Sequence, residues 1–216
     1  MEHTAPGYQF HSGILVDNVL FDLGDKRFLE REPEAIFLTH LHVDHAFFVE
    51  EEWPPFQTPI YAPERWEGHP EIKVVRHPVK VGELTVTPVP TNHSARVRSS
   101  GYIIEDGTSR MMYTGDLISV WKKFRERLPD LDLVITDGAF IRRGGLVRRD
   151  EEGRLHGHTG IPNLVSFFSQ LTGRIVFTHF GSWFFKDVDR AKREIAALSS
   201  EGTSVAAASE GMVIEL

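Results

Sequence analysis

The sequence contains no cysteine among its 216 residues. This absence excludes disulfide bonds, thiol nucleophiles and thiolate metal sites, so a metal ion could be held only by nitrogen and oxygen ligands. No run of roughly 18 consecutive apolar residues occurs, and the N-terminal segment has no basic region followed by an apolar one. We therefore expect neither a membrane span nor a secretory signal, and the cytoplasm is the default compartment.

The chain also has no excess of basic residues, because 24 Lys and Arg stand against 31 Asp and Glu, a formal net charge of -7. General nucleic-acid-binding proteins usually carry a basic domain, so this balance disfavours that class and leaves room only for a local basic patch. Apolar residues make up 41% and charged residues 25%, which is ordinary globular composition. Since no linker or repeat interrupts the chain, we expect a single domain over residues 1–216.

Strand and helix patterns follow one another in an order typical of an α/β protein. Short runs rich in β-branched and aromatic residues predict strands at 13–16, 19–21, 35–39, 60–61, 72–76, 84–89, 101–105, 110–114, 131–136, 174–178 and 212–215. Helices are predicted over 44–53, 119–128, 161–171 and 188–198. This order predicts sheets that are covered by helices on their outer faces.

The sequence contains eleven histidines, and three of them lie close together between His40 and His45. In extended backbone, residues i and i+2 share a face, so His40 and His42 can point at one cation as they leave the strand over 35–39. Asp44 and His45 follow where the chain turns and can reach a second position close by. Three histidines and an aspartate in one loop beside an apolar strand are hard to explain by packing, so the segment predicts a metal site.

Four polar residues outside the segment 40–45 share one feature: each follows a predicted apolar strand. They are Asp22, His93, Asp116 and His179. Because ends of neighbouring strands converge in α/β folds, we expect these side chains to join the first motif. Each alone fits a structural role equally well, but together they complete the ligands for two metal ions.

This ligand pattern resembles that of the metallo-β-lactamase superfamily. The residues that carry the resemblance are His40, His42, Asp44, His45, His93, Asp116 and His179. The resemblance implies an αββα four-layer sandwich. It also implies that one metal is held by His40, His42 and His93, a second by Asp44, His45 and His179, and that Asp116 bridges both. Asp22 matches a buried aspartate that orients a ligand histidine from behind.

Segments around the later ligands are similar to the phosphodiesterase branch that contains the tRNA 3′-processing endonucleases. These segments are 113–116, 132–140, 157–160 and 177–181. The similarity implies that His158 contacts the scissile phosphate or the leaving group, with Asp137 as its acidic partner. The chain departs from that branch at Thr136 and Asp137, where the branch has histidine and glutamate, and at 46–48, where it has two glycines. Only 23 positions separate His93 from Asp116, too few for the long tRNA-gripping arm, so phosphodiester chemistry is favoured over tRNA as substrate.

Two divalent ions about 3.5 to 4 Å apart can share a bridging hydroxide, lower the pKa of its parent water toward 7 and neutralise phosphoryl charge. We therefore expect a dinuclear metal-dependent hydrolase acting on a nucleic-acid or small phosphodiester. Zinc suits the imidazole-rich ligand set best, while manganese and iron also fit it. Asp44 could accept a proton during attack, and His158 could protonate the leaving oxygen. Two alternatives stay open: a hydrolase of thioesters, lactones or other carboxyl esters, and a non-catalytic metal- or ligand-binding protein of the same fold.

Two further segments allow more than one interpretation. Residues 141–154 carry five arginines and three glycines and are expected to form a mobile loop. Phosphate oxygens could be clamped there by Arg142, Arg143, Arg148 and Arg149, or the charges could simply be solvated. The aromatic residues at 183–185 could form a wall of the pocket, cover a homodimer contact or pack in the core.

Overall fold

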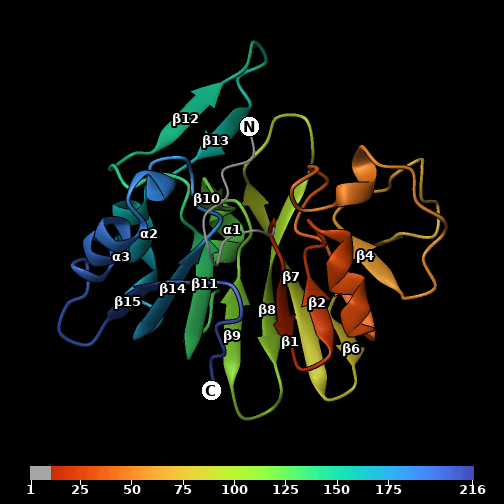
Figure 1. Ribbon diagram of the computed structural model, residues 1–216, viewed down its shortest axis with the longest axis horizontal. Coiled ribbons are helices and arrows are strands. Elements are labelled where there is room, and N and C mark those ends of the chain that lie inside the picture. Colours follow the sequence, from red (N-terminus) through yellow and green to blue (C-terminus); the bar gives the residue numbers. More distant parts are fainter. Residues whose placement is uncertain (1–10) are drawn as a thin grey trace.

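The computed structural model describes residues 11–216 and contains two β-sheets packed face to face (Figure 1). The smaller sheet has the order β1 (Ile14–Val16), β2 (Val19–Phe21), β3 (Ala35–Phe37), β4 (Ile60–Ala62) and β5 (Lys73–Val74). The larger sheet has the order β10 (Ser119–Val120), β7 (Leu84–Asn92), β8 (Ser99–Glu105), β9 (Arg110–Tyr113), β11 (Leu133–Asp137), β14 (Arg174–Thr178) and β15 (Ser204–Ala207). A further strand, β6 (Val79–Val81), pairs with β7. Both sheets contain parallel and antiparallel pairs.

Aromatic side chains fill the space between the sheets. Phe21 and Phe37 from the smaller sheet stack with ring centroids 5.6 Å apart, and Tyr102 from the larger sheet meets Phe37 at 5.5 Å. All three are completely buried. Burial of these rings, together with the aliphatic side chains around them, stabilises the packing of the two sheets.

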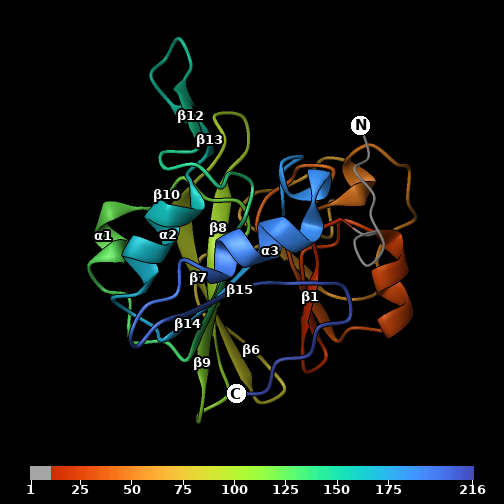
Figure 2. The ribbon, with the colours of Figure 1, turned by 60° about the vertical axis from the view of Figure 1, so that its left-hand side comes forward.

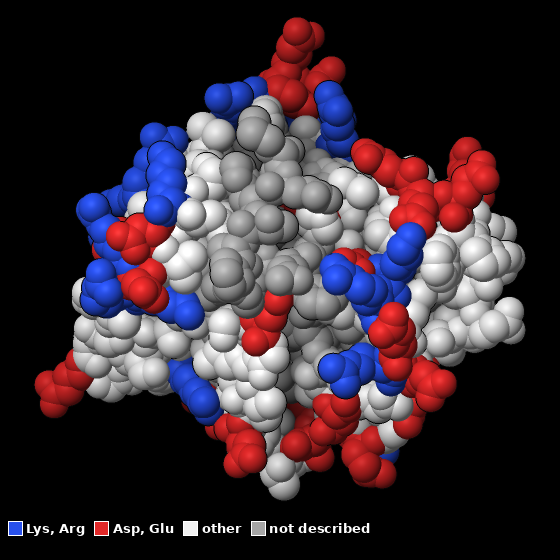
Figure 3. Space-filling view, in the orientation of Figure 1, with Lys and Arg blue, Asp and Glu red and all other residues white. Residues whose placement is uncertain are grey.

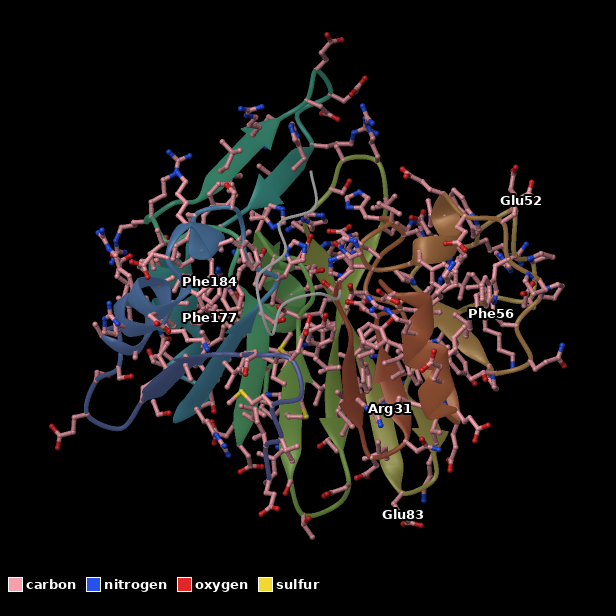
Figure 4. All side chains as sticks on the ribbon, viewed as in Figure 1. Arg31, Glu52, Phe56, Glu83, Phe177 and Phe184 are labelled. Atoms are coloured by element: carbon pink, nitrogen blue, oxygen red, sulfur yellow. The ribbon has the colours of Figure 1, made fainter. Side chains whose placement is uncertain are left out.

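Helices cover the outer face of the larger sheet. They are α2 (Ile161–Phe168), α3 (Val188–Ala196) and the short 3-10 helix η3 (Phe184–Lys186), and Figure 2 shows α2 and α3 lying across this sheet. Phe168 of α2, Phe177 of β14 and Phe184 of η3 are fully buried between the layers. Figure 4 shows Phe177 and Phe184 close together on this side of the molecule. A four-residue helix, α1 (Lys122–Arg125), follows β10.

The outer face of the smaller sheet is covered differently. Two 3-10 helices, η1 (Lys26–Arg31) and η2 (Phe47–Val49), and the long loops around them form this layer. The α-helix predicted over 44–53 is wrong, because the chain turns tightly after the histidine motif and then buries both Phe47 and Phe48 against the sheet. The four-layer sandwich is confirmed, with one outer layer built from 3-10 turns instead of α-helix.

Three other expectations need correction. Residues 119–120 are a strand, so the helix predicted over 119–128 shrinks to α1. The last strand is β15, whereas residues 212–215 form no strand and are largely exposed. The segment predicted as a mobile loop contains a two-stranded hairpin of β12 (Leu146–Arg149) and β13 (Leu155–His158), which projects from one end of the sandwich (Figure 1).

Strand direction decides where the polar residues gather. β7, β9, β11 and β14 run parallel to one another, with β8 as the only antiparallel strand between β7 and β9. β11, which overlaps the strand predicted over 131–136, is buried at all five positions and is therefore covered on both faces. The carboxyl ends of these four strands therefore meet at one end of the larger sheet, beside the ends of the parallel pair β2 and β3. Among residues 11–216, no helix has the length and apolar character needed to cross a membrane.

Candidate metal centre

The predicted ligands and the supporting Asp22 all lie beyond the ends of strands. Asp22 follows β2 and His40 lies shortly after β3, both from the smaller sheet. From the larger sheet, His93 follows β7, Asp116 lies shortly after β9 and His179 follows β14. The site is therefore assembled at the junction of the two sheets, and neither sheet alone carries it.

The first ligand group contains three imidazoles and one carboxylate. His42 Nδ1 lies 3.0 Å from His40 Nε2 and 3.3 Å from His93 Nε2. Asp116 Oδ2 lies 3.4 Å from His93 Nε2 and 3.7 Å from His40 Nε2. A tetrahedral zinc ion with bonds of about 2.0 to 2.1 Å has ligand atoms roughly 3.3 to 3.4 Å apart, so the spacing of these four atoms suits one such ion.

The second ligand group uses the other oxygen of the same aspartate. Asp116 Oδ1 lies 3.1 Å from His45 Nε2 and 3.0 Å from His179 Nδ1. Asp44 Oδ2 lies 3.0 Å from His179 Nε2. The two oxygens of Asp116 thus face two different groups of ligands, which is the arrangement that a bridging carboxylate needs.

Two buried atoms in this centre have no hydrogen-bond partner among the described residues: Asp116 Oδ1 and His179 Nδ1. They lie 3.0 Å apart, but the angles between them do not make a hydrogen bond. An unpartnered buried polar atom costs about 1 to 3 kcal/mol, so such atoms rarely persist without a ligand. Their convergence, together with the imidazole and carboxylate donors, fits a metal position that both atoms share.

Burial and charge divide the histidines into two kinds. Desolvation lowers the pKa of His40 well below its ordinary value, lowers the pKa of His42, and lowers the pKa of His93 to about 4. Burial also disfavours the charged form of His45, but the carboxylates of Asp116 and Asp22 outweigh it and raise the pKa of His45 to about 10. Asp116 likewise raises the pKa of His179 against the effect of burial. The neutral imidazoles of the first group are ready to act as ligands, whereas those of the second group hold protons that a metal would displace.

Asp22 supports the site from behind, as the sequence resemblance implies for its position. Its carboxylate accepts hydrogen bonds from the backbone N–H of Thr39 at 2.7 Å, from the hydroxyl of Thr39 at 2.9 Å and from the hydroxyl of Tyr113 at 2.7 Å. His45 Nδ1 lies 2.7 Å from Asp22 Oδ2, and this contact turns Nε2 toward Asp116. Thr39 and Tyr113 were not predicted as site residues, although both stand directly beside predicted motifs in the sequence.

Left-handed backbone occurs at two site residues that are not glycine. Asp22 has φ of 63° and His179 has φ of 53°. This conformation is costly for residues with a Cβ and persists where the surrounding structure fixes it, often at functional sites. Both residues sit directly after a strand, so the turn re-aims each side chain from the sheet toward the centre.

His158 and Asp137 form a pair beside the metal ligands. His158 Nδ1 lies 2.7 Å from Asp137 Oδ2, and His158 Nε2 lies 3.9 Å from Asp116 Oδ2. Asp137 is fully buried and also accepts hydrogen bonds from the backbone N–H groups of Leu117 and Ala139, each at 2.8 Å. Burial alone would lower the pKa of His158, but the Asp137 carboxylate dominates and holds this pKa above its ordinary value.

The hairpin is tied to the centre through β13. Gly157 accepts a hydrogen bond on its carbonyl from His93 Nδ1 at 3.0 Å, and its N–H donates to the carbonyl of His93 at 2.9 Å. The first contact leaves His93 Nε2 free to face the ligand group. No sequence signal links these two residues, since they lie 64 positions apart and meet only in the folded chain.

The four arginines predicted to clamp phosphate lie at different places in and before the hairpin. Arg142 and Arg143 precede β12 and are exposed, and Arg142 lies over the ring of Phe140 at 5.8 Å. Arg149 donates a hydrogen bond to the carbonyl of Gly153 at 2.7 Å. Arg148, one position earlier on β12, points to the opposite face of the hairpin because successive residues of a strand alternate.

The aromatic residues at 183–185 belong to the core on the helical side. Phe184 is fully buried and stacks on Phe180 with ring centroids 3.8 Å apart. The indole N–H of Trp183 donates to the carbonyl of Ala139 at 3.0 Å. Of the three interpretations of this segment, core packing is the one that the contacts support.

Comparison with known proteins identifies the family. Residues 14–180 match the family model described as the beta-lactamase superfamily domain, so the chain belongs to that superfamily. The resemblance to metallo-β-lactamases predicted from the sequence is confirmed. Family and ligand cluster together define the class: a metal-dependent hydrolase of the metallo-β-lactamase superfamily with a histidine and aspartate metal-site cluster.

Solved structures show the same fold at low sequence identity. The metallo-β-lactamase fold protein YhfI from Bacillus subtilis is 20% identical, with a TM-score of 0.67 over 96% of this chain and 92% of that one. A diphosphatase from the PhnP family is 20% identical, with a TM-score of 0.66 over 94% of this chain and 83% of that one. The short form of human tRNase Z is 18% identical, with a TM-score of 0.60 over 95% of this chain and 92% of that one. No curated protein matches the sequence.

Proposed function

We propose that this chain is a dinuclear phosphodiesterase. The first metal ion would be held by His40, His42, His93 and Asp116, and the second by Asp44, His45, His179 and Asp116. The observation that carries this proposal is the division of the Asp116 carboxylate, whose two oxygens face two separate ligand groups. One of these oxygens, Oδ1, has no hydrogen-bond partner among residues 11–216.

The donor set favours zinc, because five imidazoles and two carboxylates provide mostly nitrogen ligands. Two divalent ions at this centre would supply an activated water and neutralise negative charge that develops on a phosphoryl oxygen. The chain itself offers no cysteine thiol as nucleophile, which agrees with attack by water. Asp44 lies at the edge of the centre and its pKa is held low by His179 and His45 against desolvation, so its carboxylate is ionised and able to accept a proton from that water.

His158 is proposed to donate a proton to the leaving oxygen. Its Nδ1–H is occupied by Asp137, so the second proton of the charged ring resides on Nε2, the atom that faces Asp116 and the ligand groups. The Asp137 carboxylate raises the pKa of His158, which favours the protonated ring that this role requires. Asp137 is assigned as a positioning residue, since its oxygens are used by two backbone N–H groups and by His158.

Two of the structural neighbours carry names of enzymes that act on phosphate linkages, a diphosphatase and a tRNase. At 18 to 20% identity this likeness concerns the fold, so the preference for a phosphodiester rests on the site. A charged imidazole beside the leaving position gains most with an anionic substrate and a poor leaving group. A neutral lactone or thioester gains little from it.

A substrate panel tests the proposal. Zinc-loaded protein is assayed with bis(p-nitrophenyl) phosphate, a thioester, a lactone and nitrocefin, and the bound metal is counted by elemental analysis. We expect close to two metal ions per chain and hydrolysis of the phosphodiester. Asp116→Ala is expected to lose metal and activity, while His77→Ala, which alters an exposed histidine away from the centre, keeps both. A thioester or lactone hydrolysed far faster than the phosphodiester would replace this proposal with the carboxyl-hydrolase alternative, and a metal content near zero would reject the dinuclear centre.

A further inference from the structure

The hairpin of β12 and β13 projects beyond the sandwich at the end where the ligands gather (Figures 1 and 2). Its register pairs Leu146 with His158 and Arg148 with His156. Residues directly opposite in an antiparallel pair point to the same face, and so do residues two apart along a strand. His158, His156 and Arg148 therefore share one face of the hairpin, while Arg149 lies on the other.

The position of His158 identifies that face as the one that looks over the metal centre. His158 contacts Asp137, and its ring lies 4.8 Å from that of His93 and 5.6 Å from that of His179. His156 and Arg148 form the next pair outward along the same face. A substrate bound at the centre and extending along the hairpin would meet them first.

Neither of these two side chains has a structural role that accounts for it. His156 Nδ1 is buried without a hydrogen-bond partner, and Arg148 has no ion pair or side-chain hydrogen bond within residues 11–216. In contrast, Arg154 pairs with Asp150 at 2.7 Å and with Glu152 at 2.9 Å. The acidic residues of the hairpin lie at its tip, and Figure 3 shows them there with basic side chains nearer to the body of the molecule. Within the part of the chain that the structure describes, no carboxylate pairs with Arg148, so its positive charge can meet an anion.

We propose that Arg148 and His156 bind a second phosphate of the substrate, one nucleotide unit away from the phosphate that is cleaved. This inference rests on the proposed function, which puts the scissile phosphate at His158. Residues two apart in a strand are separated by about 7 Å, comparable to the distance between neighbouring phosphates in an extended nucleotide chain. The phosphates of a diphosphate share an oxygen and lie too close together to use both positions. The substrate class is therefore a dinucleotide or short oligonucleotide that carries a further phosphate.

Adjacent arginines on opposite faces of β12 provide a matched test. Zinc-loaded wild type, Arg148→Ala and Arg149→Ala are assayed with the dinucleotide TpT and with TpT phosphorylated at its 5′ or 3′ end. The ratio of kcat/KM with and without the added phosphate measures recognition of the second group. We expect one of the phosphorylated forms to be preferred by wild type, and Arg148→Ala to reduce this preference by about tenfold to hundredfold, as expected for a charge-assisted contact. Arg149→Ala is expected to retain the preference within about twofold.

Binding to the zinc-loaded proteins, measured by titration calorimetry with the same dinucleotides, separates the two proposals. An Arg148-dependent preference for a phosphorylated form without any turnover would uphold the inference about the hairpin and reject the phosphodiesterase. Turnover of bis(p-nitrophenyl) phosphate without a preference for added phosphate would support the phosphodiesterase and reject the inference about the hairpin. Equal losses of preference in Arg148→Ala and Arg149→Ala would overturn the inference, because a diffuse charge effect would then explain the data.

Discussion

At the scale of single residues, the centre combines histidines that are neutral with histidines that are charged in the metal-free protein. The first kind is fixed mainly by burial, as at His93, and the second by carboxylates that lie within hydrogen-bonding distance, as at His45. Because a metal ion binds only the deprotonated ring nitrogen, the second kind must release protons when the site is filled. Metal loading and protonation are therefore coupled through His45 and His179.

This coupling predicts proton release on zinc binding. At pH 7 the pKa of His45, at about 10, and the raised pKa of His179 favour the protonated form of both rings, so a metal ion that fills the second ligand group displaces two protons. The apparent affinity is expected to rise with pH by about tenfold per unit for each proton released. Titration calorimetry at pH 7 in buffers of different ionisation enthalpy measures the number released, and a heat that does not depend on the buffer would contradict the assignment.

His158 gives a second prediction at this scale. His158→Ala should reduce kcat by about 10² to 10⁴-fold on a dialkyl-type phosphodiester with a poor leaving group, and much less on bis(p-nitrophenyl) phosphate, whose leaving group departs without a proton. The acid form is favoured below its raised pKa, so the wild-type rate on the poor substrate should fall as pH rises through that pKa. The variant should lack this alkaline limb.

The leaving-group comparison also serves as the control for structural damage. A variant that had merely disturbed the centre would lose activity equally on both substrates and would keep the pH profile of the wild type. That outcome would remove the proposed proton donation by His158. Asp137→Asn should reproduce the dependence on leaving group in weaker form, since it removes the carboxylate charge that holds the pKa of His158 above its ordinary value.

At the scale of elements, the turn after β9 connects Asp116, the proposed bridging ligand, to the residues that support the site from behind. Gly115 has φ of 56°, and a Cβ added there would lie 2.6 Å from the Cβ of Thr39. Thr39 is fully buried and bonded to Asp22, so it has no room to move away. The glycine is needed both for the left-handed turn and for the close approach of the two loops.

Gly115→Ala is therefore expected to destabilise the protein by about 2 to 5 kcal/mol, the sum of backbone strain and overpacking, and to weaken zinc binding through Thr39 and Asp22. Gly144→Ala is a matched control, because Gly144 has φ of 80° but nothing lies within 4 Å of an added Cβ. It should cost only about 1 kcal/mol. Denaturant unfolding and chelator competition measure the two effects, and equal changes in both variants would show that packing against Thr39 is unimportant.

The elements also indicate what the sequence can predict. Runs of apolar, β-branched and aromatic residues were enough to predict β2, β11 and β14. The ligand motif could be recognised because His40, His42, Asp44 and His45 are close together in the sequence. The α-helix predicted after that motif was wrong because burial of Phe47 and Phe48 against the sheet outweighs the local helix propensity. The glycines and arginines of the hairpin led to the prediction of a loop. The hydrogen bond between Gly157 and His93 is a long-range contact that no local pattern reveals. The alternation of His156 and His158 was a visible signal of a strand that the prediction of a loop did not use.

At the scale of the whole molecule, the ligand set joins the two sheets. His40, His42, Asp44 and His45 come from the loop after β3 in the smaller sheet, whereas His93, Asp116 and His179 come from the larger one. The sheets are otherwise held together by the aromatic layer between them and by contacts such as Tyr102 Oη donating to the carbonyl of Leu38 at 2.6 Å. Metal ions at this junction would cross-link the sandwich at the end opposite to the turns between β8 and β9.

Zinc should therefore stabilise the fold as well as the site. A ligand that binds only the native state adds about 2.7 kcal/mol per site at a free concentration of 100 times Kd, so Tm should rise with zinc concentration and fall when a chelator removes the metal. Because the ligands of each group come from both sheets, Asp116→Ala should flatten the dependence of Tm on zinc, while His77→Ala should retain it in full. Thermal unfolding of the three proteins across a zinc series measures this linkage. A Tm that does not respond to zinc in the wild type, or that responds equally in Asp116→Ala, would mean that the metal does not join the sheets through the bridging carboxylate.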